Sequence, residues 1–512
     1  MHDRGHWKNR QIFIMAAVGS AIGLGNLWRF PYVAAQNGGG AFLVPYFVAL
    51  VSAGIPLMII EYGLGIRSQA SANIALGAIR PFFRYFGWMA ILGAFVINVY
   101  YCAVMGWTWV YLFDAGSLPE WAKDIASSKH HFMVDVLNVS GSPFELGGIQ
   151  WPILAGLVAT WVIIWAIVKG GLDRVGKVLL YTVPLPVILV LILVVRGLTL
   201  KGAATGINYY LTPDWSQLTN PQVWLAAYGQ IFFSLSVGFG TMIAYASFMP
   251  KKTEIPNSAA ITSFANCAFS FLAGFAVFSV LGYFAVASNM PVSEVTGSGP
   301  GLAFVVYPAA LATLPFWVKG FGFLFFLTLL LLGIDSAFSL LETVSAAISD
   351  KFGLSRTVST SIITGISLLL GLPFTSKAGL LWLDIVDHFI LTYLITLVGI
   401  VECIIVGYFL GVKKFAQEVN ENAEIHLGTI FCIMIWIVTP GVLMYSFILS
   451  VFKEFQKPYE GYPVPALLFM GIGSLVIVFV LAVVLGSRYT KNDREWKAIE
   501  SGILKKEKEK QV

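Results

Sequence analysis

The chain has 512 residues, of which 57% are hydrophobic and 12% are charged; its mean hydropathy is +0.79 and its formal net charge is +5. Soluble domains carry roughly 25% charged residues, so this composition excludes an ordinary soluble protein and indicates one that crosses a membrane many times. The positive charges are spread over short connections, and no stretch has the pattern of a nucleic-acid-binding surface.

Twelve apolar segments are long enough to cross a bilayer as helices. In chain order, the predicted spans cover residues 12–35, 42–65, 86–113, 151–168, 176–196, 222–248, 259–288, 318–348, 357–374, 382–411, 427–452 and 465–487. We therefore expect an all-α polytopic membrane protein with about twelve transmembrane helices.

Two of these spans are interrupted by glycines near their middle. Gly23 and Gly25 interrupt the first span, and Gly238 and Gly240 interrupt the sixth. Unpaired backbone groups are costly in a bilayer, so helix-breaking sequence is tolerated only where it lines a cavity inside the protein. Two breaks in corresponding positions indicate the substrate and ion site of a secondary transporter. We predict a 5+5 inverted repeat in which helices 1 and 6 are discontinuous.

The domain organisation follows from the same pattern. Residues 1–411 are predicted to form the transport core, residues 412–487 to hold spans 11 and 12, and residues 488–512 to form a charged tail. Lysine and arginine gather before span 1 and after spans 2, 4 and 12, whereas the connection 114–150 is acidic. By the positive-inside rule we expect a multi-pass plasma-membrane protein with both termini in the cytoplasm.

Charged residues inside the predicted spans are candidates for function. Asp335, next to Ser336 in span 8, offers the hard oxygen ligands that a small cation prefers. Two interpretations of Glu61 and Glu402 stay open. Their carboxyl groups either cap backbone groups left unpaired at the helix breaks or bind an ion directly.

Four motifs give the sequence a resemblance to the neurotransmitter:sodium symporter family, whose members have the LeuT fold. The motifs are residues 23–31 (Gly-Leu-Gly-Asn-Leu-Trp-Arg-Phe-Pro), 37–42 (Asn-Gly-Gly-Gly-Ala-Phe), 229–236 (Gly-Gln-Ile-Phe-Phe-Ser-Leu-Ser) and 333–336 (Gly-Ile-Asp-Ser). The resemblance extends over nearly the whole chain, and the first motif is highly specific. It implies sodium-coupled symport by alternating access and no covalent chemistry, so an enzyme is not expected. A non-transporting sensor or an ion channel of the same topology are the alternatives.

The resemblance implies two sodium ions. The ligands expected at the first site, beside the substrate carboxylate, are Ala21, Asn26, Ser234 and Asn266. The ligands expected at the second site are Gly19, Ile22, Leu332, Asp335 and Ser336. The substrate is expected among Ser20, Ala21, Gly23, Gly25, Ile97, Tyr101, Phe233, Ser234, Ser236, Phe239, Ser336 and Leu340.

Position 23 distinguishes substrate classes. Monoamine carriers of the family have an aspartate there, whereas Gly23 leaves room for a substrate carboxylate and favours an amino acid. The apolar residues expected around the substrate favour a small or medium-sized apolar side chain. The resemblance also implies gates: Arg29 with Asp387 on the outside, and Arg4 with Asp350, near Trp7, on the inside.

The sequence leaves open whether the protein also binds chloride. Chloride-independent bacterial members have a glutamate in span 7 where this chain has Ser270. Two sodium ions, a zwitterion and Asp335 sum to +1 in a poorly solvated site, and such a charge is costly to bury. An anion pocket of Tyr46, Gln230, Ser234 and Ser270 would compensate it; Glu61 or a coupled proton are the alternatives. The identity of the amino acid and the oligomeric state are not predicted.

Overall fold

The computed structural model describes residues 5–295 and 299–487, and within these ranges it contains helices and no β-strand. The helices of the first half are α1 (Arg10–Ala21), α2 (Leu24–Leu27), α3 (Arg29–Gln36), α4 (Leu43–Ala49), α5 (Ile55–Ser68), α6 (Ala72–Ile79), α7 (Arg84–Asp114), α8 (Leu118–Trp121), α9 (Ile125–His130), α10 (Trp151–Val168), α11 (Gly171–Thr182), α12 (Pro184–Leu198) and α13 (Ala203–Leu211). The second half holds α14 (Pro221–Ser234), α15 (Thr241–Ala246), α16 (Pro256–Ser288), α17 (Val292–Val295), α18 (Tyr307–Ala312), α19 (Val318–Phe352), α20 (Arg356–Gly371), α21 (Gly379–Phe389), α22 (Thr396–Ile404), α23 (Val412–Asn420), α24 (Thr429–Ile433), α25 (Thr439–Gln456), α26 (Val464–Ala466) and α27 (Gly473–Ser487).

The predicted all-α, polytopic fold is confirmed. Ten helical stretches of the described chain are long and apolar enough to cross a membrane, and the bent pair 10–21 and 24–36 makes an eleventh. These correspond to every predicted span except the sixth, which is divided between α14 and α15. The fifth predicted span begins earlier than expected, because the helix runs from Gly171 to Leu198 and accommodates the prolines at its middle. The total of twelve spans remains a prediction.

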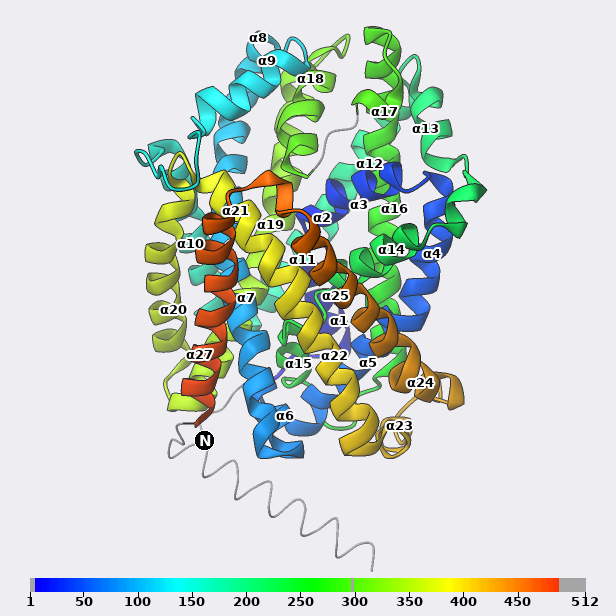
Figure 1. The fold of residues 1–512 in the computed structure, drawn as a ribbon, viewed down its shortest axis with the longest axis vertical. Helices are drawn as coiled ribbons and strands as arrows, with labels where there is room; N and C mark the ends of the chain where they lie inside the picture. The colour runs from blue at the N-terminus through cyan, green and yellow to red at the C-terminus, as the bar shows by residue number, and fades with distance from the viewer. Residues whose placement is uncertain (1–4, 296–298, 488–512) are drawn as a thin grey trace, which may run out of the picture.

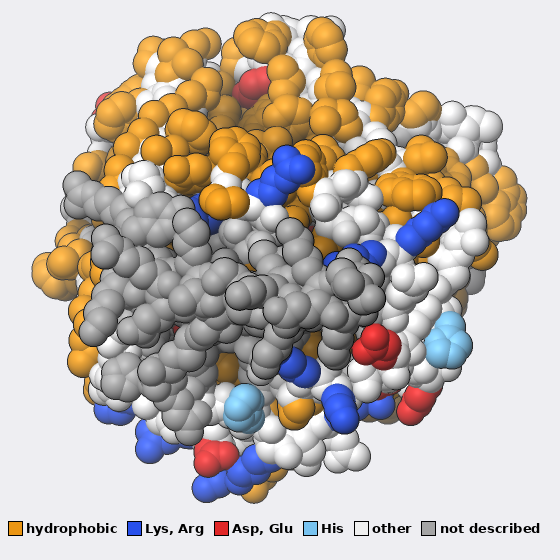
Figure 2. Space-filling model, turned by 90° about the horizontal axis from the view of Figure 1, so that it is seen from below, with side chains coloured by type: hydrophobic (Ala, Val, Ile, Leu, Met, Phe, Trp, Pro, Cys, Tyr) orange, Lys and Arg blue, Asp and Glu red, His pale blue; other side chains and the backbone are white. Residues whose placement is uncertain are grey.

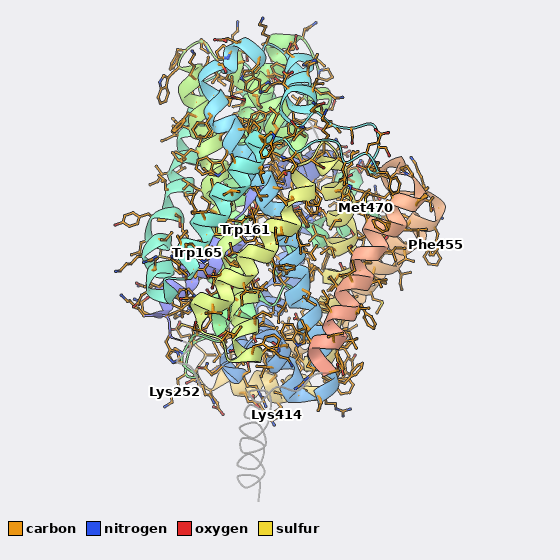
Figure 3. All side chains as sticks on the ribbon, turned by 90° about the vertical axis from the view of Figure 1, so that its left-hand side faces the viewer. Trp161, Trp165, Lys252, Lys414, Phe455 and Met470 are labelled. Carbon is orange, nitrogen blue, oxygen red and sulfur yellow. The ribbon has the colours of Figure 1, made fainter. Side chains whose placement is uncertain are left out.

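The spans differ strongly in burial. In α7 and α19, 83% of the most apolar window is buried, and these two helices pack against each other more extensively than any other pair. In the stretches 429–461 and 464–487 only 22% and 28% of the window is buried. Their apolar side chains, such as Phe455 in Figure 3, point outward. A surface of this composition is suited to hydrocarbon and not to water.

Both predicted breaks are present. The first lies at Ile22 and Gly23, where α1 and α2 meet at a bend of 62°. The second extends over residues 235–240 between α14 and α15, and Gly238 and Gly240 have φ angles of 83° and 70° there. Glycine adopts this left-handed region without steric cost, so these two residues let the chain leave the helix and re-enter it.

The connections contain structure that hydropathy did not predict. The segment 114–150 contains α8 and α9, and the segment 302–312 forms a buried apolar helix that includes α18. The latter is too short to be recognised as a span. Figure 1 shows α8, α9 and α18 at one end of the bundle and α6 and α23 at the other. Lysine and arginine side chains are visible at that second end (Figure 2), and Lys252 and Lys414 mark it in Figure 3.

Candidate substrate and ion site

A cavity of about 70 Å³ lies between the two helix breaks. All twelve residues predicted around the substrate line it, and they come from α1, α2, α7, α14, α19 and both helix breaks. Sequence reasoning missed Leu24, Tyr100 and Ser339, which also line it. Tyr100 is the chain neighbour of Tyr101, which was predicted to contact the substrate. Because this helix is apolar on all sides, its sequence has no periodicity that would show which of the two tyrosines faces the cavity. The fold therefore brings the predicted residues together around one space.

Gly23 is confined on the side that faces α19. A Cβ at this position would lie 2.7 Å from the hydroxyl oxygen of Ser336 and 3.3 Å from that of Tyr101. The amide of Leu24 points to the Tyr101 hydroxyl, with an N–O distance of 3.4 Å. This wall of the cavity thus presents two hydroxyl groups and a backbone amide, all of which can donate to a carboxylate.

The residues predicted for the first sodium ion form one buried polar cluster. The side-chain amide of Asn26 donates to the side-chain oxygen Oδ1 of Asn266 at 2.8 Å and to the hydroxyl of Ser270 at 2.7 Å. Asn266 in turn donates to the hydroxyl of Ser234 at 2.8 Å. Ala21 lines the adjacent cavity. The cluster concentrates carbonyl and hydroxyl oxygens at the first break, which fits a small hard cation.

The second predicted sodium site surrounds a buried carboxylate. Asp335 is 2% exposed, and its Oδ1 has no hydrogen-bond partner in the described structure. A Cβ at Gly19 would lie 3.3 Å from Asp335 Oδ2, so α1 approaches this carboxylate closely. Since α1 ends at Ala21, the carbonyls of its last turn lack the usual helical partners. A cation between Asp335 and these carbonyls would give a partner to the carboxylate oxygen and to the carbonyl oxygens.

Tyr46, which lies beside Ser270 of the first cluster, and Gln230, which precedes Ser234 by one turn of α14, are completely buried. Within the described residues, neither the Tyr46 hydroxyl nor the Gln230 amide group has a hydrogen-bond partner. The Tyr46 ring lies beside Cys267 and Ser270, without a hydrogen bond of good geometry. A buried polar group left unpaired costs about 1–3 kcal/mol. The Tyr46 hydroxyl and the Gln230 amide nitrogen are donors that an anion would satisfy, whereas the Gln230 amide oxygen is an unpaired acceptor.

The predicted outer gate residues are near the cavity but form no ion pair in the described structure. The guanidinium carbon of Arg29 lies 4.5 Å from the centre of the Phe233 ring, and its Nη1 has no hydrogen-bond partner. Asp387 accepts a 2.6 Å hydrogen bond from the Tyr100 hydroxyl instead. The aromatic side chains of Phe233 and Tyr100 thus hold the two charges in separate contacts.

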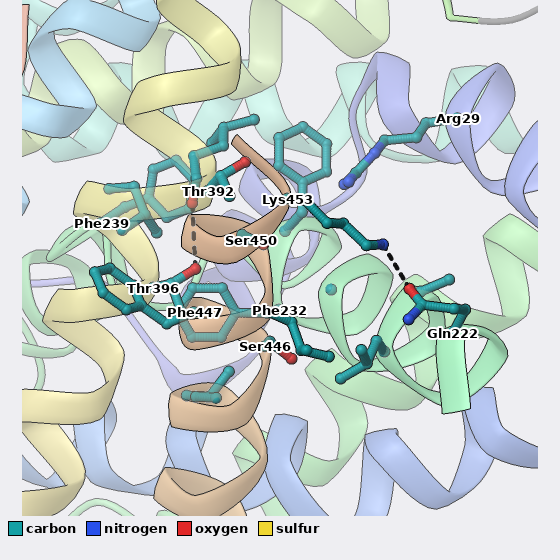
Figure 4. Close-up of a pocket in the computed structure, with 18 residues that line it drawn as sticks. Arg29, Gln222, Phe232, Phe239, Thr392, Thr396, Ser446, Phe447, Ser450 and Lys453 are labelled. Carbon is teal, nitrogen blue, oxygen red and sulfur yellow. Dashed lines mark hydrogen bonds between the residues drawn. The ribbon is translucent and has the colours of Figure 1, made fainter. Parts of the chain in front are cut away.

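A second cavity, of about 310 Å³, lies on the other side of this aromatic layer. It is bounded by α14, α22 and α25, and Phe233 and Phe239 line both cavities. Figure 4 shows Arg29 reaching into it and Lys453 donating to Gln222, over 2.7 Å, at its rim. Phe233 therefore forms part of the partition between the central cavity and a wider, more polar space.

At the opposite end of the bundle, the segment before α1 is hydrogen-bonded to α15 and to the segment that follows it. Trp7 is buried, its indole nitrogen donates to the carbonyl of Tyr245 at 2.9 Å, and its amide donates to the carbonyl of Phe248 at 3.1 Å. Asp350 accepts from the hydroxyl of Ser71 at 2.8 Å. Arg4, the other residue predicted for the inner gate, lies outside the described residues.

Comparison with known proteins identifies similar chains along most of the sequence. The model of the sodium:neurotransmitter symporter family matches residues 4–124 and 114–491. An uncharacterized sodium-dependent transporter of Methanocaldococcus jannaschii is 41% identical over 489 residues, which are 94% of this chain and 97% of that protein. A sodium- and chloride-dependent glycine transporter of Xenopus laevis is 33% identical, with 90% and 80% of the two chains covered. A sodium-dependent dopamine transporter of Caenorhabditis elegans is 32% identical, with 90% and 83% covered.

Proposed function

The chain belongs to the sodium:neurotransmitter symporter family, and from this premise we propose that it transports a small or medium-sized apolar amino acid by alternating access. Membership makes it a sodium-coupled membrane transporter and not an enzyme. Overall similarity does not select the substrate, because the relatives named for glycine and for dopamine are almost equally similar to the chain. The substrate class has to be argued from the cavity.

The confinement of Gly23 is the observation that carries the amino-acid proposal. The hydroxyls of Ser336 and Tyr101 and the amide of Leu24 surround this position, and Gly23 itself has no side chain to bind the amine of a substrate that lacks an acid group. The substrate carboxylate would lie here, next to the first sodium ion. That contact would make the binding of substrate and sodium mutually dependent.

The rest of the cavity supports an apolar side chain. Ile97, Phe233, Phe239 and Leu340 supply the apolar part of its lining, beside polar side chains such as Ser236, Ser339 and Asp387. A charged side chain buried against these four apolar residues would be unfavourable. The cavity volume of about 70 Å³ is in keeping with a small substrate.

Two sodium ions are proposed as co-substrates. The first would lie among the oxygens of Ala21, Asn26, Ser234 and Asn266, and the second between Asp335 and the carbonyls of Gly19, Ile22 and Leu332, with the Ser336 hydroxyl. The buried Asp335 carboxylate, whose Oδ1 has no hydrogen-bond partner in the described residues, is the strongest support for the second ion.

Chloride is proposed as the compensating anion. The support is the unpartnered buried donors of Tyr46, which lies beside Ser270, and of Gln230, together with a relative whose name states chloride dependence. In the proposed cycle, Arg29 and Asp387 close the outer side, and Arg4 and Asp350 close the inner side next to Trp7. The lysine-bearing end of the bundle would face the cytoplasm, with both termini, in the plasma membrane.

Uptake into proteoliposomes tests this function. Each of the twenty amino acids is offered while sodium and chloride are varied independently, and the Gly23→Asp variant serves as the binding-defective control. Concentrative, saturable, sodium-dependent uptake of an apolar amino acid is expected. Non-saturating ion flux would indicate a channel, and sodium-dependent binding without uptake would indicate a sensor; either result would contradict the proposal.

A further inference from the structure

A third cavity, of about 590 Å³, lies apart from the proposed transport sites. Its walls are the last turns of α7, the first turns of α10 and the helical segment His131–Val136, which continues α9 at one end of the bundle (Figure 1). Among the described residues, it shares no lining residue with the central cavity or with the cavity on the other side of Phe233. The acidic connection 114–150 supplies its charged residues. The proposed transport cycle therefore leaves this space without a role.

The charged part of the lining is acidic. His131 lies between Asp114 and Asp135: its Nε2 atom is 3.5 Å from Oδ2 of Asp114, and its Nδ1 atom is 3.3 Å from Oδ2 of Asp135. His130, 3.6 Å from the same Asp135 oxygen, is mostly exposed and does not line the cavity. Lysine and arginine are absent from the described lining. Even with His131 protonated, two carboxylates and one imidazolium sum to a net negative charge, so the lining attracts a cation.

The cation that fits is not a small metal ion. The imidazole ring of His131 lies between the two carboxylates, and it is stacked on Trp121 with ring centres 4.1 Å apart. The ring therefore keeps the carboxylates from converging on one small ion, and within the described chain no group of three His, Cys, Asp or Glu side chains could hold a metal. Because His131 contacts Oδ2 of each aspartate, the Oδ1 atoms remain for a larger cation that carries several donors.

Two stacked aromatic rings line the same cavity. Trp109 and Phe113 are one turn apart on α7, and their ring centres are 6.1 Å apart at an interplanar angle of 23°. The indole nitrogen of Trp109 donates to the hydroxyl of Thr160 at 3.1 Å, which fixes this ring against α10. The face of an aromatic ring attracts an ammonium group within about 6 Å of its centre. These rings therefore favour an organic ammonium group over a hydrated metal ion.

The wall formed by α10 is apolar. It consists of small residues, namely Ala155, Gly156 and Ala159. At 1.5 Å per residue they lie about 6–12 Å along the helix from Trp151, where this apolar span begins. Pro152 and Ala155 are exposed, so the cavity opens sideways along the membrane span. The cavity thus combines an acidic end with an apolar wall that continues into the span.

We propose that this cavity is a binding site for an amphiphilic amine, with its ammonium group at the carboxylates of Asp114 and Asp135 and its apolar chain along the small residues of α10. The ammonium group offers three donors, and charge-assisted hydrogen bonds are about twice as strong as neutral ones. The chain gains free energy by leaving water. An ethanolamine phospholipid fits less well, because its phosphate would bring a negative charge next to the same carboxylates. A fatty acid is disfavoured for the same reason.

Photolabelling of the purified full-length protein in phosphatidylcholine nanodiscs tests the site. The probe is a decylamine that carries a diazirine on its alkyl chain, and mass spectrometry maps the labelled residues. We expect labelling around residues 109–114 and 150–159, competition by excess unlabelled decylamine, and at least tenfold less labelling when Asp114→Asn and Asp135→Asn are combined. Glu120→Gln removes a negative charge from an exposed position of the same connection. It is the matched control and should be labelled like the wild type.

Equal labelling of the wild type and the double variant would overturn the proposal, because recognition would not depend on the two carboxylates. Equal labelling by an uncharged decanol with the same diazirine would show a groove for any apolar chain, and stronger competition by an ethanolamine phospholipid than by decylamine would show a lipid site; both results contradict it. If the double variant does not fold, Ala155→Phe replaces it, since a phenyl ring would fill the space beside α10 without changing the charge. It should lower labelling at least fivefold, and unchanged labelling would also overturn the proposal. The measurement needs neither sodium nor a transported substrate, so its failure is distinct from failure of the proposed function.

Discussion

Gly25 and Phe233 are in contact across the first break: a Cβ at position 25 would lie 2.8 Å from Cε1 of the Phe233 ring. That distance is too short for a carbon–carbon contact, so the glycine sets the position of the ring that separates the central cavity from the outer one. The same ring carries the Arg29 guanidinium on its face. One missing side chain in α2 therefore determines where the outer closing layer of the cavity lies.

Gly25→Ala should displace Phe233 and weaken closure over the substrate. We expect a loss of substrate affinity of about tenfold, or about 1.4 kcal/mol, without loss of folding. Equilibrium binding of the preferred amino acid measures it. Gly365→Ala is the matched control, because nothing lies within 4 Å of a Cβ at that exposed helical position. Equal affinities in the two variants would show that Phe233 does not close the site.

Gly23→Asp should abolish binding of zwitterionic amino acids. The new carboxylate would lie among the hydroxyls of Ser336 and Tyr101, where the substrate carboxylate is proposed to bind. Like charges in a low-dielectric site repel by several kcal/mol, here on the order of 2–4 kcal/mol. Binding of alanine and leucine at saturating sodium is the measurement. Retained affinity for either would place the substrate elsewhere.

Asp335→Asn should separate sodium binding from folding. In sodium-free buffer we expect the variant to be at least as stable as the wild type, because it removes a buried carboxylate with an unpartnered oxygen. Added sodium should raise the melting temperature of the wild type and leave that of the variant nearly unchanged, and sodium-driven uptake should be lost. An equal sodium-induced shift in both proteins would show that Asp335 does not ligate the ion.

Ser270→Glu should make substrate binding independent of chloride. In the wild type, replacing chloride with gluconate should weaken sodium-dependent substrate affinity, since Tyr46 and Gln230 would lose the anion that they hold. A fixed carboxylate at position 270 would supply the same negative charge. The comparison is of substrate affinity with and without chloride for both proteins. Indifference of the wild type to chloride at neutral pH would show that another group supplies the compensating charge.

Substrate size gives a further test of the cavity. Each buried methylene contributes about 0.8 kcal/mol, so that affinity should rise along glycine, alanine and larger apolar amino acids until the cavity is full. Aspartate, glutamate, lysine and arginine should compete at least a hundredfold less well, because their charge would be buried unpaired. Competition against a radiolabelled apolar amino acid measures the order. Preference for a charged amino acid would contradict the assignment of Ile97 and Leu340 to the side-chain pocket.

The sequence alone determined the helical spans and the two breaks. A bilayer requires about twenty apolar residues per helix and permits glycine interruptions only inside the protein, so hydropathy and the positions of Gly23, Gly25, Gly238 and Gly240 carry this information directly. Hydropathy did not predict the apolar helix at residues 302–312, which is buried but does not span the membrane. This helix is shorter than the apolar length by which a membrane span is recognised.

Only the tertiary structure decided which side chains meet. In a uniformly apolar helix such as α7, no periodicity separates the face of the cavity from that of the lipid, so Tyr101 was selected through family resemblance and Tyr100 was missed. The separate contacts of Arg29 and Asp387, the unpartnered donors of Tyr46 and Gln230, and the hydrogen bond from the Gly238 amide to Glu61 depend on helices far apart in the chain. Such contacts are set by packing between helices, and packing is a property of three-dimensional distances that no local pattern encodes.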